Sequence, residues 1–139
     1  MSTPASTANS ILDLIYRSIT WDDMAENDTT APATVLDIAL HTAAPASATQ
    51  TSNEATFGSY ARVSVARTAA GWNAAGGGSL SNLAAIEFVE ATSGPQTITY
   101  VSVGKAGTII HYGALVASRT IDSGIKPVFS ASALVSSIT

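Results

Sequence analysis

The chain has 139 residues, enough for one domain, and its charged content of 12% is about half of the usual ~25%. The six Lys and Arg residues are dispersed and are outnumbered by ten Asp and Glu, so the basic cluster that nucleic-acid binding needs is missing. There is no cysteine, and no apolar run approaches the ~20 residues that cross a bilayer. We therefore expect no disulfide, no thiol chemistry, no nucleic-acid partner and no membrane partner.

The N-terminal region has the only helical periodicity that we find. Residues 1–9 form a polar tail, and Ser10–Ile19 reads as a short helix with Ser10 as its N-cap. An apolar stripe at four-residue spacing follows this helix, formed by Ile11, Ile15 and Ile19 with Leu12 and Tyr16 beside them. Such a short helix needs a surface to dock on. The polar, acid-rich connector from Trp21 to Ala33 completes a predicted docking arm, residues 1–33.

Strand-like patterns follow from residue 34 onward. Residues 34–42 are rich in branched side chains and predict a buried strand, and residues 43–58 form a long loop of small polar residues. Short strand candidates then alternate with turn signals, at residues 60–67, 79–82, 84–90, 96–103, 108–117 and 127–138. This spacing predicts an all-β fold, an antiparallel β-sandwich of jelly-roll type over residues 34–139, with one short N-terminal helix.

The residues that carry most enzyme chemistry are sparse and separated. His41 and His111 lie in different strand candidates, and no G-x-S-x-G motif marks a serine as a nucleophile. The acids of the connector lack the spacing of a calcium loop, so a solvated acidic segment is favoured over a weak calcium site. We therefore predict no catalytic residue, no cofactor and no metal ligand. A Ser/His/Asp arrangement assembled in space is the remaining enzymatic alternative.

Several segments, in order, resemble those of one known protein family. The strand Val35–Ala43 (VLDIALHTA) is similar to the family's L-x-V-A-L-H-T-A, and Lys126–Leu134 is similar to its P-x-F-x-A-G-A-L ending, with Ser132 in place of Gly. The collinear segments between them are residues 51–54, 58–67, 71–72, 81–88 and 112–115. The family that these segments resemble is that of small tailed-bacteriophage virion proteins. Its members are phage structural proteins, some tail-fibre-like and others capsid decoration or cement proteins. The resemblance implies a β-rich subunit bound to the outside of a virion, and it brings no catalytic residue.

From these patterns we expect a capsid decoration or cement protein, assembled in the host cytoplasm and located on the capsid surface of the virion. Its expected partners are the major capsid protein and copies of itself, as a trimer or dimer. The N-terminal tail, the helix and the loop Ala43–Gly58 are the expected contact elements, because none has an obvious place in a β core. The predicted contact residues are Ile11, Ile15, Ile19, Tyr16, Trp21, Trp72 and Arg62.

Trp72 is flanked by glycine and small residues, which favours an exposed anchor in an interface. The alternative is a tryptophan that closes one end of the core. Three other functions stay open. The first is a tail, collar or fibre-associated virion protein, the second a carbohydrate-binding module that uses Trp72, Tyr60 and Tyr100, and the third a hydrolase.

Overall fold

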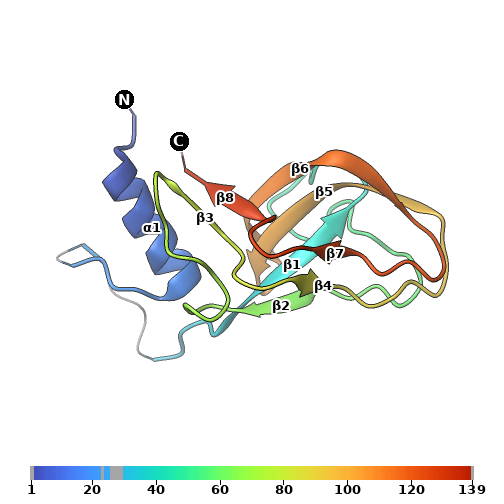
Figure 1. The fold of residues 1–139 in the computed structure, drawn as a ribbon, viewed down its shortest axis with the longest axis horizontal. Coiled ribbons are helices and arrows are strands. Elements are labelled where there is room, and N and C mark those ends of the chain that lie inside the picture. Colours follow the sequence, from blue (N-terminus) through green and yellow to red (C-terminus); the bar gives the residue numbers. More distant parts are fainter. Residues whose placement is uncertain (1, 23, 26–29, 139) are drawn as a thin grey trace. The chain divides into compact units, whose positions relative to one another are not determined.

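The computed structural model describes residues 2–22, 24–25 and 30–138. Within them the chain forms one helix and eight strands (Figure 1), which are α1 (Ala5–Arg17), β1 (Val35–His41), β2 (Val63–Ala66), β3 (Ser79–Ser81), β4 (Ile86–Glu87), β5 (Gln96–Lys105), β6 (Thr108–Ile121), β7 (Val128–Phe129) and β8 (Val135–Ser137). The strands form antiparallel sheets, one of four strands in the order β2-β1-β5-β6 and two of two strands, β3-β8 and β4-β7. The predicted fold class, all-β with one short N-terminal helix, is confirmed.

The chain divides into two compact units. The first contains Met1–Val35, Ala66–Ile86 and Phe129–Thr139, and the second contains Leu36–Val65 and Glu87–Val128. The division predicted from the sequence, an arm of residues 1–33 and a domain of residues 34–139, stays a prediction.

Helix α1 of the first unit begins earlier than predicted. Pro4 occupies the N-cap position without a side-chain cap, and Ser10 lies inside the helix, where its hydroxyl donates to the Ser6 carbonyl. The predicted N-cap at Ser10 is therefore wrong, and Ala5–Asn9 is helical rather than a tail. The early turn is held by tertiary contacts, because Ala8 is buried and Asn9 Oδ1 accepts a hydrogen bond from the Gly78 backbone N–H.

The buried face of α1 is Ala8, Leu12 and Tyr16, a stripe adjacent to the isoleucines singled out in the sequence. The Tyr16 ring packs edge-on against Trp72, with ring centroids 4.7 Å apart, and its hydroxyl lies 2.6 Å from Ser136 Oγ. Burial raises the pKa of Tyr16 to about 12. Buried Asn82 ties the neighbouring backbone together, because its Nδ2 donates to the carbonyls of Ala84 and Ser130.

Arg67 closes the C-terminal end of α1. Its guanidinium donates to the carbonyls of Leu14 (2.6 Å), Ile15 (2.5 Å) and Ala33 (3.2 Å). Ser18 follows the helix in the left-handed conformation, with φ of 57°, which ends the helical ladder. The last carbonyls of a helix lack intrahelical partners, and a cation there also interacts favourably with the helix dipole.

The four-stranded sheet gives the second unit its core. In β1 and β5, which pair from Asp37↔Gly104 to His41↔Tyr100, the apolar side chains that are buried are Leu36, Ile38, Ala39, Leu40, Ile98, Val101 and Val103. β1 is buried on both faces, with Ile38 and Leu40 on one and Ala39 and His41 on the other. On the second of these faces the Ser52 carbonyl lies 2.9 Å from His41 Nδ1. β6 is the edge strand beside β5 and extends four residues beyond its predicted end, to Ile121.

Candidate functional site

The predicted contact residues occupy very different environments. Trp72 is 1% exposed and Tyr16 is completely buried, so the expected exposure of Trp72 is wrong and the alternative, a core-closing tryptophan, is confirmed. Ile11, Ile15 and Trp21 are half-buried, and Ile19 is 43% exposed. Of this set, only Ile19 presents a large exposed apolar side chain.

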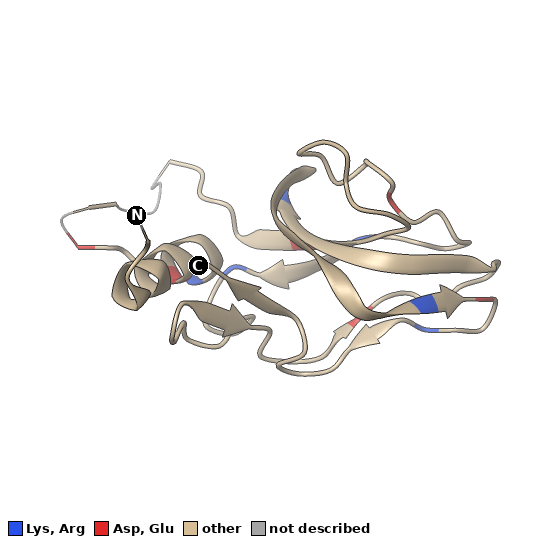
Figure 2. Ribbon diagram, turned by 90° about the horizontal axis from the view of Figure 1, so that it is seen from above, with Lys and Arg blue, Asp and Glu red and all other residues tan. Residues whose placement is uncertain are grey.

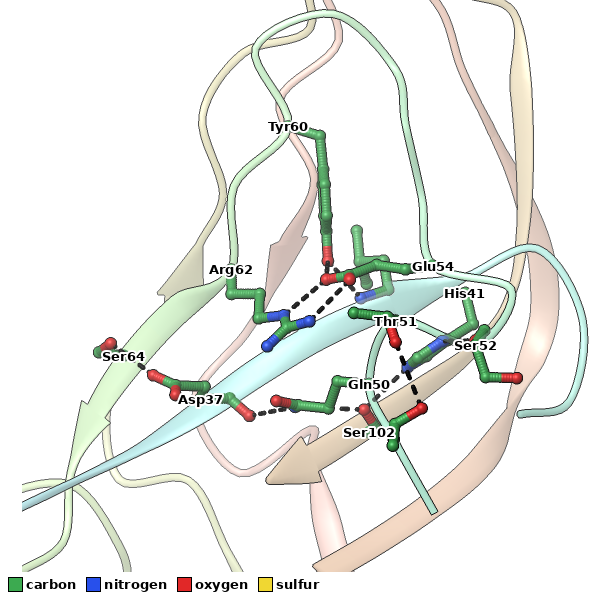
Figure 3. Close-up of polar contacts among 12 residues, drawn as sticks. Asp37, His41, Gln50, Thr51, Ser52, Glu54, Tyr60, Arg62, Ser64 and Ser102 are labelled. Atoms are coloured by element: carbon green, nitrogen blue, oxygen red, sulfur yellow. Dashed lines mark hydrogen bonds and ion pairs between the residues drawn. The ribbon is translucent and has the colours of Figure 1, made fainter. Parts of the chain in front are cut away.

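Arg62, the remaining predicted contact residue, is engaged within the chain (Figure 3). Its Nε and Nη2 donate to the two carboxylate oxygens of Glu54, over 2.6 and 2.7 Å, and the Tyr60 hydroxyl donates to the same carboxylate at 3.1 Å. The Tyr60 oxygen also accepts from the Leu40 backbone N–H, which links the group to β1. Burial raises the pKa of Glu54, but the hydrogen bonds and charge of Arg62 outweigh this and hold it below its ordinary value.

His41 and Ser102 form a second, fully buried part of this cluster. The Ser52 carbonyl lies 2.9 Å from His41 Nδ1, so Nδ1 carries the proton, and Nε2 accepts from the Ser102 hydroxyl at 2.8 Å. Gln50 Nε2 donates to the Asp37 carbonyl at 2.8 Å and to Ser102 Oγ at 3.3 Å. Burial lowers the pKa of His41, which favours the neutral ring that this arrangement requires.

This serine and histidine lie at hydrogen-bond distance, as a nucleophile and its base would. Ser102 is only 1% exposed and His41 is completely buried, so no substrate reaches the pair in this conformation. The second ring nitrogen of His41, Nδ1, faces the Ser52 backbone carbonyl rather than a carboxylate. The arrangement instead fastens the segment 43–58 to the sheet.

That segment was expected to lack a place in the β core, and this expectation is wrong. Gln50, Ala55 and Phe57 are buried, and Glu54 and Ser52 supply acceptors to the cluster described above. The segment also pairs with the start of β6, where the Ile109 N–H donates to the Ala48 carbonyl. Sequence reasoning missed this group because its members come from β1, β5 and a loop whose composition looks featureless.

The second unit has five large exposed apolar side chains. They are Val89, Tyr112, Val116, Ile125 and Val128, and Val116 is fully exposed. The first unit also has large exposed apolar side chains, at Ile19, Met24, Leu83 and Val135. Among the described residues, Lys, Arg, Asp and Glu are scattered along the ribbon (Figure 2). In the part of the chain that the structure describes, no group of three or more His, Asp or Glu side chains is arranged to hold a metal ion. Three acids of the predicted segment Trp21–Ala33, namely Asp23, Glu26 and Asp28, lie outside the described residues.

Antiparallel sheets, ionisable groups paired within the chain and exposed apolar side chains are the features of a β-rich structural protein. The sequence model of the family described as Podophage GP4 fiber I protein gp80 matches residues 2–137, and the chain belongs to this family. It is thus a virion structural protein of a tailed phage, as the resemblance implied. No curated protein sequence matches the chain. None of the helices described is long and apolar enough to span a membrane.

Proposed function

We propose that the chain is a fibre-associated subunit of the virion that works by packing against other protein subunits and not by catalysis. The observation that carries this proposal is the family match, which extends over residues 2–137 and describes a fiber protein. It favours the fibre-associated alternative over the head-decoration role that we expected from the sequence.

The physical character of the surface supports a packing role. In the described part of the chain, the cluster of Glu54, Arg62 and Tyr60, with His41 beside them, is hydrogen-bonded internally. The large exposed side chains on the second unit are valine, isoleucine and tyrosine, which lose little conformational entropy when a partner covers them. Burial of apolar area contributes about 25 cal/mol per Å² before the costs of association.

The competing role is capsid decoration, with the major capsid protein as partner. It is supported by the same low charge content and exposed apolar side chains, which suit any close-packed subunit, and so the position in the virion decides between them. The carbohydrate-binding alternative depended on Trp72, Tyr60 and Tyr100 acting together. Because Trp72 is buried, that set is not available, and we do not propose it.

Electron microscopy of intact virions labelled with gold-conjugated antibodies against the chain tests the location. Virions that lack the chain are the control for antibody specificity. We expect label at the fibres, and a copy number by quantitative mass spectrometry that matches the fibre number rather than the capsid lattice. Label spread over the head, with a copy number that follows the major capsid protein, would show that the decoration role is correct.

A further inference from the structure

Three side chains bring a hydroxyl, a base and a carboxamide together in the interior of the second unit (Figure 3). They meet at Ser102 Oγ, which lies 2.8 Å from His41 Nε2 and 3.3 Å from Gln50 Nε2. All three residues are at most 1% exposed, so a substrate from solution is excluded. The reaction open to such a group is one between its own members.

The Gln50 carboxamide has a defined orientation beside Ser102. Its Nε2 donates to the Asp37 carbonyl, which can only accept, and this fixes the nitrogen on the side of Ser102. Gly104 makes room for the group, because a Cβ there would lie 2.6 Å from Gln50 Cδ. The 3.3 Å from Nε2 to Ser102 Oγ and a C–N bond of about 1.33 Å place Cδ within about 4.6 Å of that oxygen. Reacting atoms lie about 3–3.5 Å apart, so a shift of about 1 Å completes the approach.

The other end of the same carboxamide is unsatisfied. Gln50 Oε1 is buried and has no hydrogen-bond partner in the part of the chain that the structure describes. A buried amide oxygen without a partner raises the free energy of the folded state. An ester oxygen is a weaker acceptor than an amide oxygen, so conversion of this amide to an ester reduces that cost.

We propose that Gln50 and Ser102 become joined by an intramolecular ester bond, formed once in each chain after the second unit folds. His41 Nε2 takes the proton from Ser102 Oγ, the oxygen attacks Gln50 Cδ, and a C–O bond forms. His41 then gives the proton to the Gln50 nitrogen, the C–N bond breaks, and ammonia leaves. One hydroxyl and one carboxamide thus become one ester and one ammonia, and no other reactant takes part.

His41 is arranged as the base that this step needs. Its Nδ1 carries the proton that faces the Ser52 carbonyl, so the lone pair of Nε2 is directed at the Ser102 hydroxyl. Amides are intrinsically more stable than esters, but groups held in contact react with effective molarities of about 10⁵–10⁸ M. Because no described donor faces Gln50 Oε1, the oxyanion formed there is unstabilised, and we expect a slow reaction that one event per chain tolerates.

The bond would give the chain a covalent link that its composition otherwise denies it. There is no cysteine, so a disulfide cannot form. The ester joins the segment 43–58 to β5, at two residues that are 52 positions apart in the sequence. The burial of all three side chains keeps water from hydrolysing the product. This inference goes beyond the proposed packing role and applies wherever the subunit lies in the virion.

The mass of the purified, folded chain tests the proposal. After incubation for several days we expect a mass about 17 Da below that of the sequence, which is the mass of one ammonia. Tryptic digestion should then give the peptides 18–62 and 68–105 joined to each other. Mild alkali should separate them, because it cleaves esters and leaves amides intact.

Substitutions assign the roles within the group. Ser102→Ala removes the nucleophile and Gln50→Glu removes the amide, so each variant should keep the full mass of its own sequence. His41→Gln should slow the loss of ammonia on the order of 100-fold. The matched control is Thr56→Ala, because Thr56 Oγ1 accepts from Gln96 Nε2 at 3.0 Å in a hydroxyl–carboxamide contact to which His41 does not contribute. This variant should lose ammonia as the natural chain does.

The natural chain decides the outcome even where a variant fails to fold. If it is folded, as judged by its resistance to protease, and keeps its full mass throughout the incubation, the proposal is overturned and the group is held by hydrogen bonds alone. A loss of ammonia that persists in Ser102→Ala, or that maps to other peptides, overturns it as well. The experiment uses only the purified chain, so its failure is distinct from failure of the proposed location.

Discussion

A change at Gly104 tests how tightly the segment 43–58 is fastened to the sheet. A Cβ at this position would lie 2.5 Å from the Thr108 carbonyl oxygen and 2.6 Å from the Gln50 Cδ. The first contact is with backbone that is paired in the β5-β6 ladder, so it cannot move away cheaply. The second would displace the Gln50 amide from the Asp37 carbonyl and from Ser102.

We therefore expect Gly104→Ala to lower the free energy of unfolding by about 3–5 kcal/mol. Overpacking at a close contact costs about 1–3 kcal/mol, and each lost hydrogen bond adds about 1 kcal/mol. Gly113→Ala is the matched control in the adjacent strand, because its Cβ would meet nothing within 4 Å. That change should be neutral or slightly stabilising.

The assay is urea denaturation of the two variants beside the natural chain, with amide hydrogen exchange to locate the effect. The Gly104 variant should show faster exchange at Gln50 and Ile109, whose N–H groups donate to carbonyls that fasten the segment. Equal stability of the two alanine variants would refute the packing argument at Gly104.

Three further predictions test the remaining contacts. Arg67→Met removes three hydrogen bonds at the C-terminal end of α1 and should cost about 2–3 kcal/mol in urea unfolding, whereas Arg119→Met at an exposed site should stay within about 0.5 kcal/mol. Trp72→Ala should lower the free energy of unfolding by about 3–5 kcal/mol. Trp72→Phe should lower it by less, because the indole N–H has no hydrogen-bond partner among the described residues. Unchanged stability of Trp72→Ala in calorimetry would contradict the core position of Trp72. Burial lowers the pKa of His41 and His111 below 6.5, so the unfolded chain binds more protons there, and unfolding free energy should be full above pH 6.5 and fall below it. His41→Gln should flatten this dependence, and a pH series with the same slope as the natural chain would contradict it.

The strands were predictable because burial follows their local pattern. The run Val35–His41 is rich in branched side chains, and β2 to β6 begin or end within a few residues of their predicted ranges. The single strand predicted over residues 127–138 is wrong, because the structure has two short strands there, β7 and β8, in different sheets. Gly and Pro residues, which indicate turns, mark the ends of these segments in the sequence. The all-β class needs no information beyond such local spacing.

The site depended on contacts between distant segments, which a local pattern does not contain. Arg62 looked available to a partner, but Glu54 in the preceding loop neutralises it. Trp72 looked exposed among small residues, but the Tyr16 ring of α1 covers it. The start of α1 was missed for the same reason, since its first turn lacks a capping side chain and is held by packing at Ala8.

The first unit is built from segments at both ends of the sequence, and this affects the order in which it folds during synthesis. The hydroxyl of Tyr16 in α1 is hydrogen-bonded to Ser136 Oγ, and the Ile138 N–H donates to the Gly78 carbonyl. The packing of the first segment of the chain therefore depends on contacts with the last segment. The ribosome releases the helix long before the residues that finish its surroundings exist. Contacts of such large sequence separation form slowly, because the intervening chain must first be closed into a loop. We therefore expect the first unit to complete its packing only after the C-terminal segment has been synthesised.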